Sequence, residues 1–294
     1  MREKRKPCRK RSLEELNVID DFLMNAAASD PEGGAEFCRL LLSALLERNI
    51  TAVTVNTQKV LPAYTPELHG IRMDVEVREE TETILNIYDI EPCLYHAGVE
   101  NLAKRNRFYQ GKIDGRYLAG GEKDYSHLPN LYVIMILPFD PFGKDYMVYR
   151  FRNRCEELPE LDYPDGLRYI YFNTRGRKGG SPDIREILDY LQKSTEENAK
   201  TDTLQNLHRH IQKVKVRPEV KEEYMLLEEK INYERNDAKR DQTIDYIIDF
   251  LKDYGELSEE LYQRIEAETD PDTLKRWVKL AARCGSLNAF REQM

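Results

Sequence analysis

Residues 71–93 read IRMDVEVREETETILNIYDIEPC, and this stretch decides which fold the chain can adopt. In residues 71–77, charged side chains alternate with apolar ones, which is typical of a strand with one polar face. Residues 84–91 predict a second strand, which a proline ends. The charged run between them is a short connection. The stretch therefore predicts a β-hairpin over 71–91 that brings Asp74 and Glu91 together at one end of a sheet.

The surrounding pattern predicts an α/β core followed by helices. Helical periodicity covers 35–48 and the Lys- and Arg-rich residues 99–118, and strand signals cover 51–56, 145–152 and 167–174. Residues 131–138, LYVIMILP, are continuously apolar, which favours a central strand buried on both faces. From 181 onward only helical periodicity remains. We expect a basic tail at 1–11, an α/β core at 12–180 and a helical extension at 181–294.

Composition excludes several classes of protein. The chain has 294 residues, 40% of them hydrophobic, and a net charge of -8, so nucleic-acid binding would depend on local basic patches. Its five cysteines form no CxxC pair, which argues against a zinc site or a disulfide framework. No apolar run approaches the ~18 residues of a membrane span. These features predict a cytoplasmic protein with no membrane partner, whose basic tail is either solvated or a phosphate-contacting arm.

Two converging carboxylates are the ligands of a hard divalent cation. Mg²⁺ (or Mn²⁺) is typically held by one or two carboxylates together with the phosphate of a substrate. Asp74 and Glu91 are the candidate metal ligands. Asp89 shares a strand face with Glu91, and we interpret it as a local hydrogen-bonding neighbour. Cys93 lies on the same face as both.

The strand pair resembles the D…(D/E)xK pair of the PD-(D/E)XK nuclease superfamily. Within it, the chain is most similar to the recombination-promoting nuclease and PD-(D/E)XK-family transposase group. Residues 102–143, LAKRNRFYQGKIDGRYLAGGEKDYSHLPNLYVIMILPFDPFG, resemble the signature of that group more specifically than the acids do. Residues 19–27 and 37–48, the run MVYRFRNRCEELPELDYPDGLRYIYFNTRG, and the ending DTLKRWVKLAARCGSLNAF also resemble it.

The resemblance implies a restriction-endonuclease-like mixed sheet flanked by helices. It also implies a Mg²⁺-dependent DNA endonuclease that hydrolyses phosphodiester bonds, with Asp74 and Glu91 as catalytic metal ligands. Glu47 falls where some members of the superfamily place a helix acid. Cys93 departs from the pattern, because active members usually have Lys or Gln there, and a thiol is a poor donor without positive charge. Lys104, which is our candidate for the catalytic cation, or Arg105 could enter the site from the next helix.

The expected DNA contacts are to the backbone. Six cations form the candidate track, on the helix at 99–118 and in the loop TRGRKGG at 174–180: Arg105, Arg107, Lys112, Arg175, Arg177 and Lys178. The alternatives are an ordinary solvated helix face and a flexible connection. The C-terminal helices could form a homodimer or regulate the core. The alternative function is a catalytically degraded member that serves as a nucleic-acid-binding or assembly protein.

Overall fold

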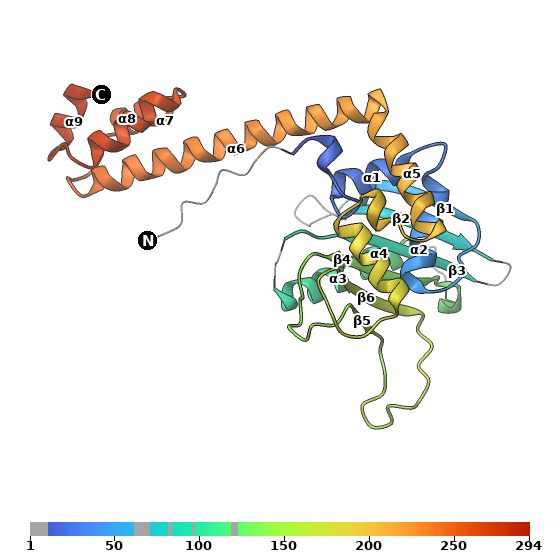
Figure 1. Ribbon diagram of the computed structural model, residues 1–294. Coiled ribbons are helices and arrows are strands. Elements are labelled where there is room, and N and C mark those ends of the chain that lie inside the picture. Colours follow the sequence, from blue (N-terminus) through green and yellow to red (C-terminus); the bar gives the residue numbers. More distant parts are fainter. Residues whose placement is uncertain (1–10, 62–70, 82–83, 96–97, 119–122) are drawn as a thin grey trace. The chain divides into compact units, whose positions relative to one another are not determined.

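The computed structural model describes residues 11–61, 71–81, 84–95, 98–118 and 123–294, and of residues 58–61 and 71–74 it describes the backbone alone (Figure 1). The helices are α1 (Asp21–Ser29), α2 (Gly34–Leu46), α3 (Val99–Asp114), α4 (Pro182–Gln192), α5 (Asp202–Val216), α6 (Pro218–Lys252), α7 (Glu259–Glu266), α8 (Pro271–Ala281) and α9 (Leu287–Gln293). The strands are β1 (Val53–Leu61), β2 (Ile71–Glu80), β3 (Leu85–Pro92), β4 (Asn130–Leu137), β5 (Val148–Phe151) and β6 (Leu167–Asn173). The predicted α/β class is confirmed.

The strands form one mixed sheet in the order β1-β2-β3-β4-β6-β5. The first three strands are antiparallel neighbours, which confirms the predicted hairpin, and β3, β4 and β6 run parallel. β4 lies between β3 and β6, and its residues 133–137 are fully buried, as its continuous apolar sequence predicts. β1 extends to Leu61, beyond the expected end at 56, because it pairs with β2 over its whole length. The carboxyl ends of the three parallel strands therefore meet at one edge of the sheet.

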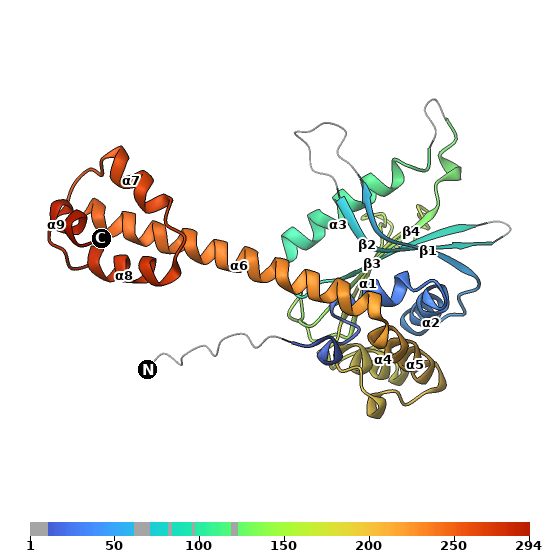
Figure 2. The same cartoon turned by 90° about the horizontal axis from the view of Figure 1, so that it is seen from above.

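Helices cover both faces of the sheet (Figures 1 and 2). One face packs against α1 and α2, on which α4 and α5 lie in turn. The apolar stripe of α2, including Phe37, Leu41 and Leu45, is completely buried there. The other face is covered by α3, whose Leu102 and Ile113 side chains pack against the strands. A residue of β2 or β3 therefore faces either the helical layer or α3, depending on its position in the period-two alternation.

A buried polar network lies on the face toward α2. The Glu79 carboxylate accepts hydrogen bonds from the Tyr88 hydroxyl at 2.5 Å, the Asn86 amide at 3.0 Å and the Thr51 backbone N–H at 3.1 Å. The Arg48 guanidinium lies 3.3 Å from the same carboxylate. Glu79 is only 4% exposed, so these donors replace the water that burial removes. The network ties the start of β1 to the β2–β3 pair.

Glu79 makes the stability of the fold depend on pH. Burial opposes its ionisation, but the hydrogen bonds from Tyr88, Thr51 and Asn86 outweigh burial and lower the pKa of Glu79. A lowered folded-state pKa stabilises the protein above the ordinary value of 4.5 and loses that contribution as pH falls further. We expect Glu79→Gln to cost on the order of 2 kcal/mol at neutral pH and progressively less below the ordinary pKa.

Thermal unfolding of the wild type and of Glu79→Gln, from neutral pH down to about 3.5, measures this dependence. The exposed Glu80, the next residue on β2, supplies the control variant Glu80→Gln, which should follow the wild type. A difference between the wild type and Glu79→Gln that stays constant across the pH range would contradict the account.

The chain divides into two compact units, Met1–Lys221 and Glu222–Met294. Hydrogen bonds that join α4 and α5 to the N-terminal residues around α1 explain why these two helices belong to the first unit. The backbone N–H of Ile19 donates to Leu191 at 3.2 Å, and His210 Nε2 lies 2.9 Å from the carbonyl oxygen of Ala27. The boundary in the structure thus differs from the one expected at residue 181, because α4 packs against α2, and α5 packs against α1 and α2.

The second unit has a hydrophobic core of its own. The end of α6 packs with α7, α8 and α9 around buried side chains that include Leu251, Ile265, Trp277 and Phe290. α6 is 35 residues long and charged along its length. None of the helices among the described residues combines the length and apolar composition needed to cross a bilayer.

Candidate functional site

Three acids line the face of the β2–β3 pair that α3 covers. Glu76 of β2 lies opposite Asp89 of β3, and Glu91 follows two residues later on the same face of β3. The exposed fraction is 0% for Glu76 and Asp89 and 2% for Glu91. A buried carboxylate is costly unless a cation or hydrogen-bond donors accompany it. The row therefore depends on what α3 brings to it.

α3 brings cations to both ends of this acidic row. Arg105 forms an ion pair with Glu91, and Arg116, just beyond the helix, forms one with Glu76. Arg78 on β2 also reaches Glu76, with 3.2 Å between Arg78 Nε and Glu76 Oε1. Residues 105 and 116 are three helical turns apart, so they lie over the same face of the sheet. The layer between α3 and the sheet is thus ionic at these points.

Tyr109 lies beside the Arg105–Glu91 pair. The Arg105 guanidinium carbon lies 5.0 Å from the centroid of the Tyr109 ring, at cation–π distance. Burial, followed by the charge of Glu91, raises the pKa of Tyr109. Burial by itself would lower the pKa of Arg105, but Glu91 and Tyr109 raise it, so the guanidinium stays charged. The site therefore holds a permanent cation against a buried carboxylate.

Cys93 ends the same row, next to Arg105. Its backbone N–H donates to Ile136 at 3.0 Å, which continues the pairing of β3 with β4. The thiol lies 3.3 Å from the Tyr95 carbonyl oxygen, and Arg105 Nη1 lies 3.9 Å from Cys93 Sγ. Cys93 is 8% exposed. A cation from α3 thus lies beside Cys93, the position at which the sequence departs from the Lys or Gln of the pattern that it resembles.

The structure does not bring Lys104 to this site. Its ammonium lies 2.5 Å from Glu100, one helical turn away, and the Lys104 side chain is 63% exposed. Successive helical positions are about 100° apart, so Arg105 and Lys104 point in different directions. Of the two cations considered from the sequence, Arg105 is the one that reaches Glu91.

The basic residues of α3 do not share one solvent face. Arg107 is exposed, but Lys112 is only 9% exposed and lies over the Phe108 ring at 5.7 Å. Arg105 points toward the sheet. The expected DNA track on this helix therefore separates into Arg107, which faces solvent, and two cations that face the protein.

The loop at 174–180 is pinned to its neighbours and exposes its cations. The backbone N–H groups of Arg177 and Lys178 donate to the Asp145 carbonyl, at 2.9 and 2.8 Å. Arg177 Nε also lies 3.0 Å from the Asp145 carboxylate, and Arg175, Arg177 and Lys178 are all exposed. The loop follows β6, at the edge where β3 also ends. These hydrogen bonds argue against the flexible-connection interpretation.

Asp74 is part of β2, but its side chain lies outside the described residues. The β2–β3 register pairs Val75 with Ile90, and one further step along it brings the backbone of Asp74 opposite that of Glu91. Among the described residues, no group of three or more His, Cys, Asp or Glu is arranged to hold a metal ion.

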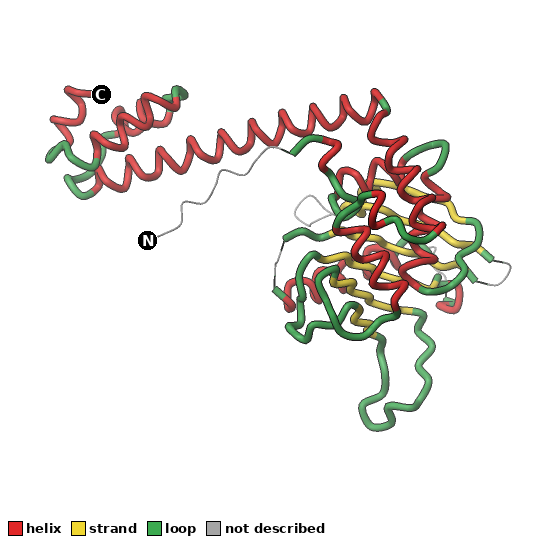
Figure 3. The backbone as a smooth tube through the Cα atoms, viewed as in Figure 1, coloured by secondary structure: helices red, strands yellow, loops and turns green. Residues whose placement is uncertain are grey.

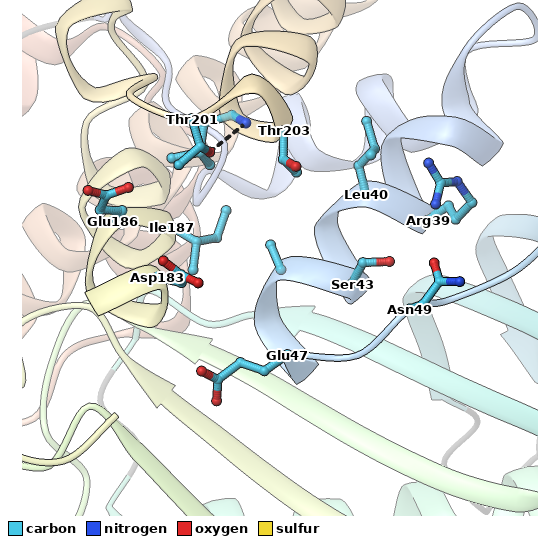
Figure 4. Close-up of a pocket in the computed structure, with 12 residues that line it drawn as sticks. Arg39, Leu40, Ser43, Glu47, Asn49, Asp183, Glu186, Ile187, Thr201 and Thr203 are labelled. Carbon is cyan, nitrogen blue, oxygen red and sulfur yellow. Dashed lines mark hydrogen bonds between the residues drawn. The ribbon is translucent and has the colours of Figure 1, made fainter. Parts of the chain in front are cut away.

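Glu47 does not join the acidic row. It follows α2 in a left-handed conformation (φ 53°) and lines a pocket of 540 Å³ between α2, α4 and the start of α5 (Figure 4). Asp183 and Glu186 on α4 line the same pocket, and Arg150 lies 3.8 Å from Glu47. Neither Glu91 nor Arg105 lines it.

Sequence reasoning missed Glu76, Arg116 and Tyr109 as neighbours of the site and interpreted Asp89 as a local hydrogen-bonding neighbour. Two signals could have found them: the period-two spacing of Glu76 and Asp74, and the helical spacing of Arg105 and Tyr109. The tube in Figure 3 shows the strand pair and the helix that carry them.

No protein-family model, curated protein or solved structure matches the chain.

Proposed function

We propose that this protein is a divalent-cation-dependent nuclease of the PD-(D/E)XK type that cleaves DNA phosphodiester bonds. One observation supports the proposal: the β2–β3 register, continued one step beyond Val75 and Ile90, sets the backbone of Asp74 opposite that of Glu91, and Arg105 pairs with Glu91. The order α2, β1, β2, β3, α3, β4, with β3 parallel to β4, agrees with the order that the sequence resemblance implies. A restriction-endonuclease-like core is part of the same proposal.

The residues at this edge fit a Mg²⁺ or Mn²⁺ ion by their chemistry. Asp74 and Glu91 offer carboxylate oxygens, the ligands that hard cations prefer, and substrate phosphate completes such sites. A bound ion supplies the charge that polarises the phosphate and lowers the pKa of its bound water. Arg105 offsets negative charge beside Glu91 and Cys93, which is the electrostatic role that a lysine at position 93 would have had.

Charge distribution supports DNA as the partner. Residues 222–294 contain 11 Lys and Arg and 18 Asp and Glu, which leaves 34 and 35 for residues 1–221. The net charge of -8 thus belongs almost entirely to the second unit, and the α/β unit is close to neutral. A near-neutral unit with exposed cations such as Arg107 and Arg175 repels phosphate less than the total suggests.

A specific observation also favours a second candidate, a catalytically degraded member that binds nucleic acid. Glu91 is 2% exposed and already paired with Arg105, so the pair could be a purely structural replacement for the metal.

Nicking of supercoiled plasmid by the full-length protein with Mg²⁺, Mn²⁺ or EDTA distinguishes the nuclease from the catalytically degraded member. The nuclease proposal expects nicking with Mg²⁺ or Mn²⁺ and none with EDTA. DNA binding without nicking under every condition would establish the second candidate.

The backbone contacts give a prediction about salt. Each phosphate contact contributes about -0.9 to the slope of log K against log salt concentration. We expect Arg107→Gln and Arg175→Gln each to reduce the magnitude of that slope by about 1, and Arg177→Gln to reduce it less, because Asp145 already offsets its charge. Fluorescence anisotropy with a duplex oligonucleotide measures the slope. The exposed Lys279 on α8 supplies the control Lys279→Gln, which should leave the slope unchanged. An unchanged slope in both Arg107→Gln and Arg175→Gln would contradict the assigned track.

A further inference from the structure

The segment 222–239 of α6 is exposed and carries large apolar side chains. Met225 is 62% exposed, Leu226 is 59% exposed and Ile231 is 38% exposed, and Tyr224 and Leu227 are half-exposed. The segment therefore has the character of a helix that is completed by a partner.

The apolar residues include a coiled-coil seam. Val220, Tyr224, Leu227 and Ile231 are separated by four, three and four residues, which is the spacing of alternating d and a positions in a heptad. Val220 is already 9% exposed at the base of α6, so the available seam begins at Tyr224. Such a seam buries its side chains by packing against a second helix with the same spacing.

The charges beside the seam select the orientation of that partner. In a parallel pair each g position faces the e position of the next heptad, which sets Glu223 against Glu228 and Lys230 against Arg235. Both pairs are repulsive. In an antiparallel pair, each g position faces a g position of the other helix, and each e position faces an e position.

In the antiparallel register that places Tyr224 opposite Leu227, the flanking pairs are complementary. Glu223 faces Lys230 of the second copy, and Lys221 faces Glu228 of the second copy. The two-fold symmetry repeats each pair. The apolar layers at the centre are then Tyr224 with Leu227 and Leu227 with Tyr224.

We propose that residues 221–230 of α6 pair with the same residues of a second copy in an antiparallel, two-fold symmetric dimer. The seam at Tyr224 and Leu227 supplies the apolar contact, and the pairing of Glu223 with Lys230 sets the direction. The seam is short, so the dimer is concentration-dependent and belongs to the small, transient class of interface. The surface is independent of the acidic row on β2 and β3.

Two adjacent leucines give a matched test of the face that is used. Leu227 lies on the seam and Leu226 lies 100° away from it on the same helix. Sedimentation equilibrium of the full-length protein measures the dimer dissociation constant. We expect Leu227→Ser to raise it by about tenfold or more, because an apolar side chain from each copy leaves the interface, and Leu226→Ser to leave it within about twofold.

A charge substitution tests the direction of pairing. In the antiparallel dimer Glu223→Lys sets two cations against each other and weakens association, and the combined change with Lys230→Glu restores it. In a parallel dimer the single change would strengthen association by facing Glu228. A protein that is monomeric at every concentration, a larger loss for Leu226→Ser than for Leu227→Ser, or stronger association of Glu223→Lys would each overturn the proposal.

Discussion

Glu91→Gln is expected to reduce Mg²⁺-dependent plasmid nicking by about a hundredfold or more, and Asp74→Asn is expected to do the same. Each substitution keeps the size of the side chain and removes the negative charge that would hold the cation. Glu91 is buried at the edge where β3 ends, and the β2–β3 register, continued one step beyond Val75 and Ile90, sets the backbone of Asp74 opposite it. The amide oxygen that replaces a carboxylate is a much weaker ligand for a hard cation.

The exposed Glu80 on β2 supplies the matched control, because Glu80→Gln removes the same charge from the same strand away from the site. It should nick at the wild-type rate. The rates are compared as initial rates of supercoiled plasmid loss. Wild-type nicking by both Glu91→Gln and Asp74→Asn would remove the two-carboxylate mechanism while leaving the fold unaffected.

Arg105→Gln is expected to lower the free energy of unfolding by about 3 kcal/mol, because it removes the guanidinium that is paired with the buried Glu91 carboxylate. The neighbouring Lys104→Gln should change it by less than about 0.5 kcal/mol, because its pair with Glu100 is exposed. Urea unfolding monitored by circular dichroism measures both values. The two variants remove one positive charge each from adjacent positions of α3, so the comparison isolates the contact with Glu91.

The double variant Arg105→Gln with Glu91→Gln sharpens this test. The double variant removes both charges of the pair together, so it should cost less than Arg105→Gln alone. The Arg105 guanidinium and a bound metal ion would compete for the same Glu91 carboxylate. Removing the guanidinium should therefore strengthen metal binding, so that Mn²⁺ raises the melting temperature of Arg105→Gln more than that of the wild type. Equal destabilisation by Arg105→Gln and Lys104→Gln would contradict the proposed contact.

The sequence predicted the sheet well because its signals are local. The alternation in 71–77, the apolar run at 131–138 and the prolines that end strands act within a few residues, and the structure has strands at each of these places. The division into two units was harder to predict. A helical pattern from 181 onward does not reveal which helices pack onto α1 and α2 over the sheet, and α4 and α5 do so.

The candidate site was predicted in part. Strand periodicity indicated that Glu91 and Asp89 share a face, but only the cross-strand register shows Glu76 opposite Asp89. Lys104 and Arg105 are adjacent in sequence, and the direction in which α3 faces the sheet decides which of them meets Glu91. That rotation depends on packing of residues such as Leu102 and Ile113, which local charge patterns do not reveal.

The most direct test of the central claim is the binding of Mn²⁺ to the full-length protein, followed by electron paramagnetic resonance of the free ion. The account predicts that the wild type removes Mn²⁺ from solution at a site that is lost in Asp74→Asn and in Glu91→Gln and kept in Glu80→Gln. Mn²⁺ binding of equal strength in all four proteins, or in none of them, would contradict the assignment of Asp74 and Glu91 as the metal ligands.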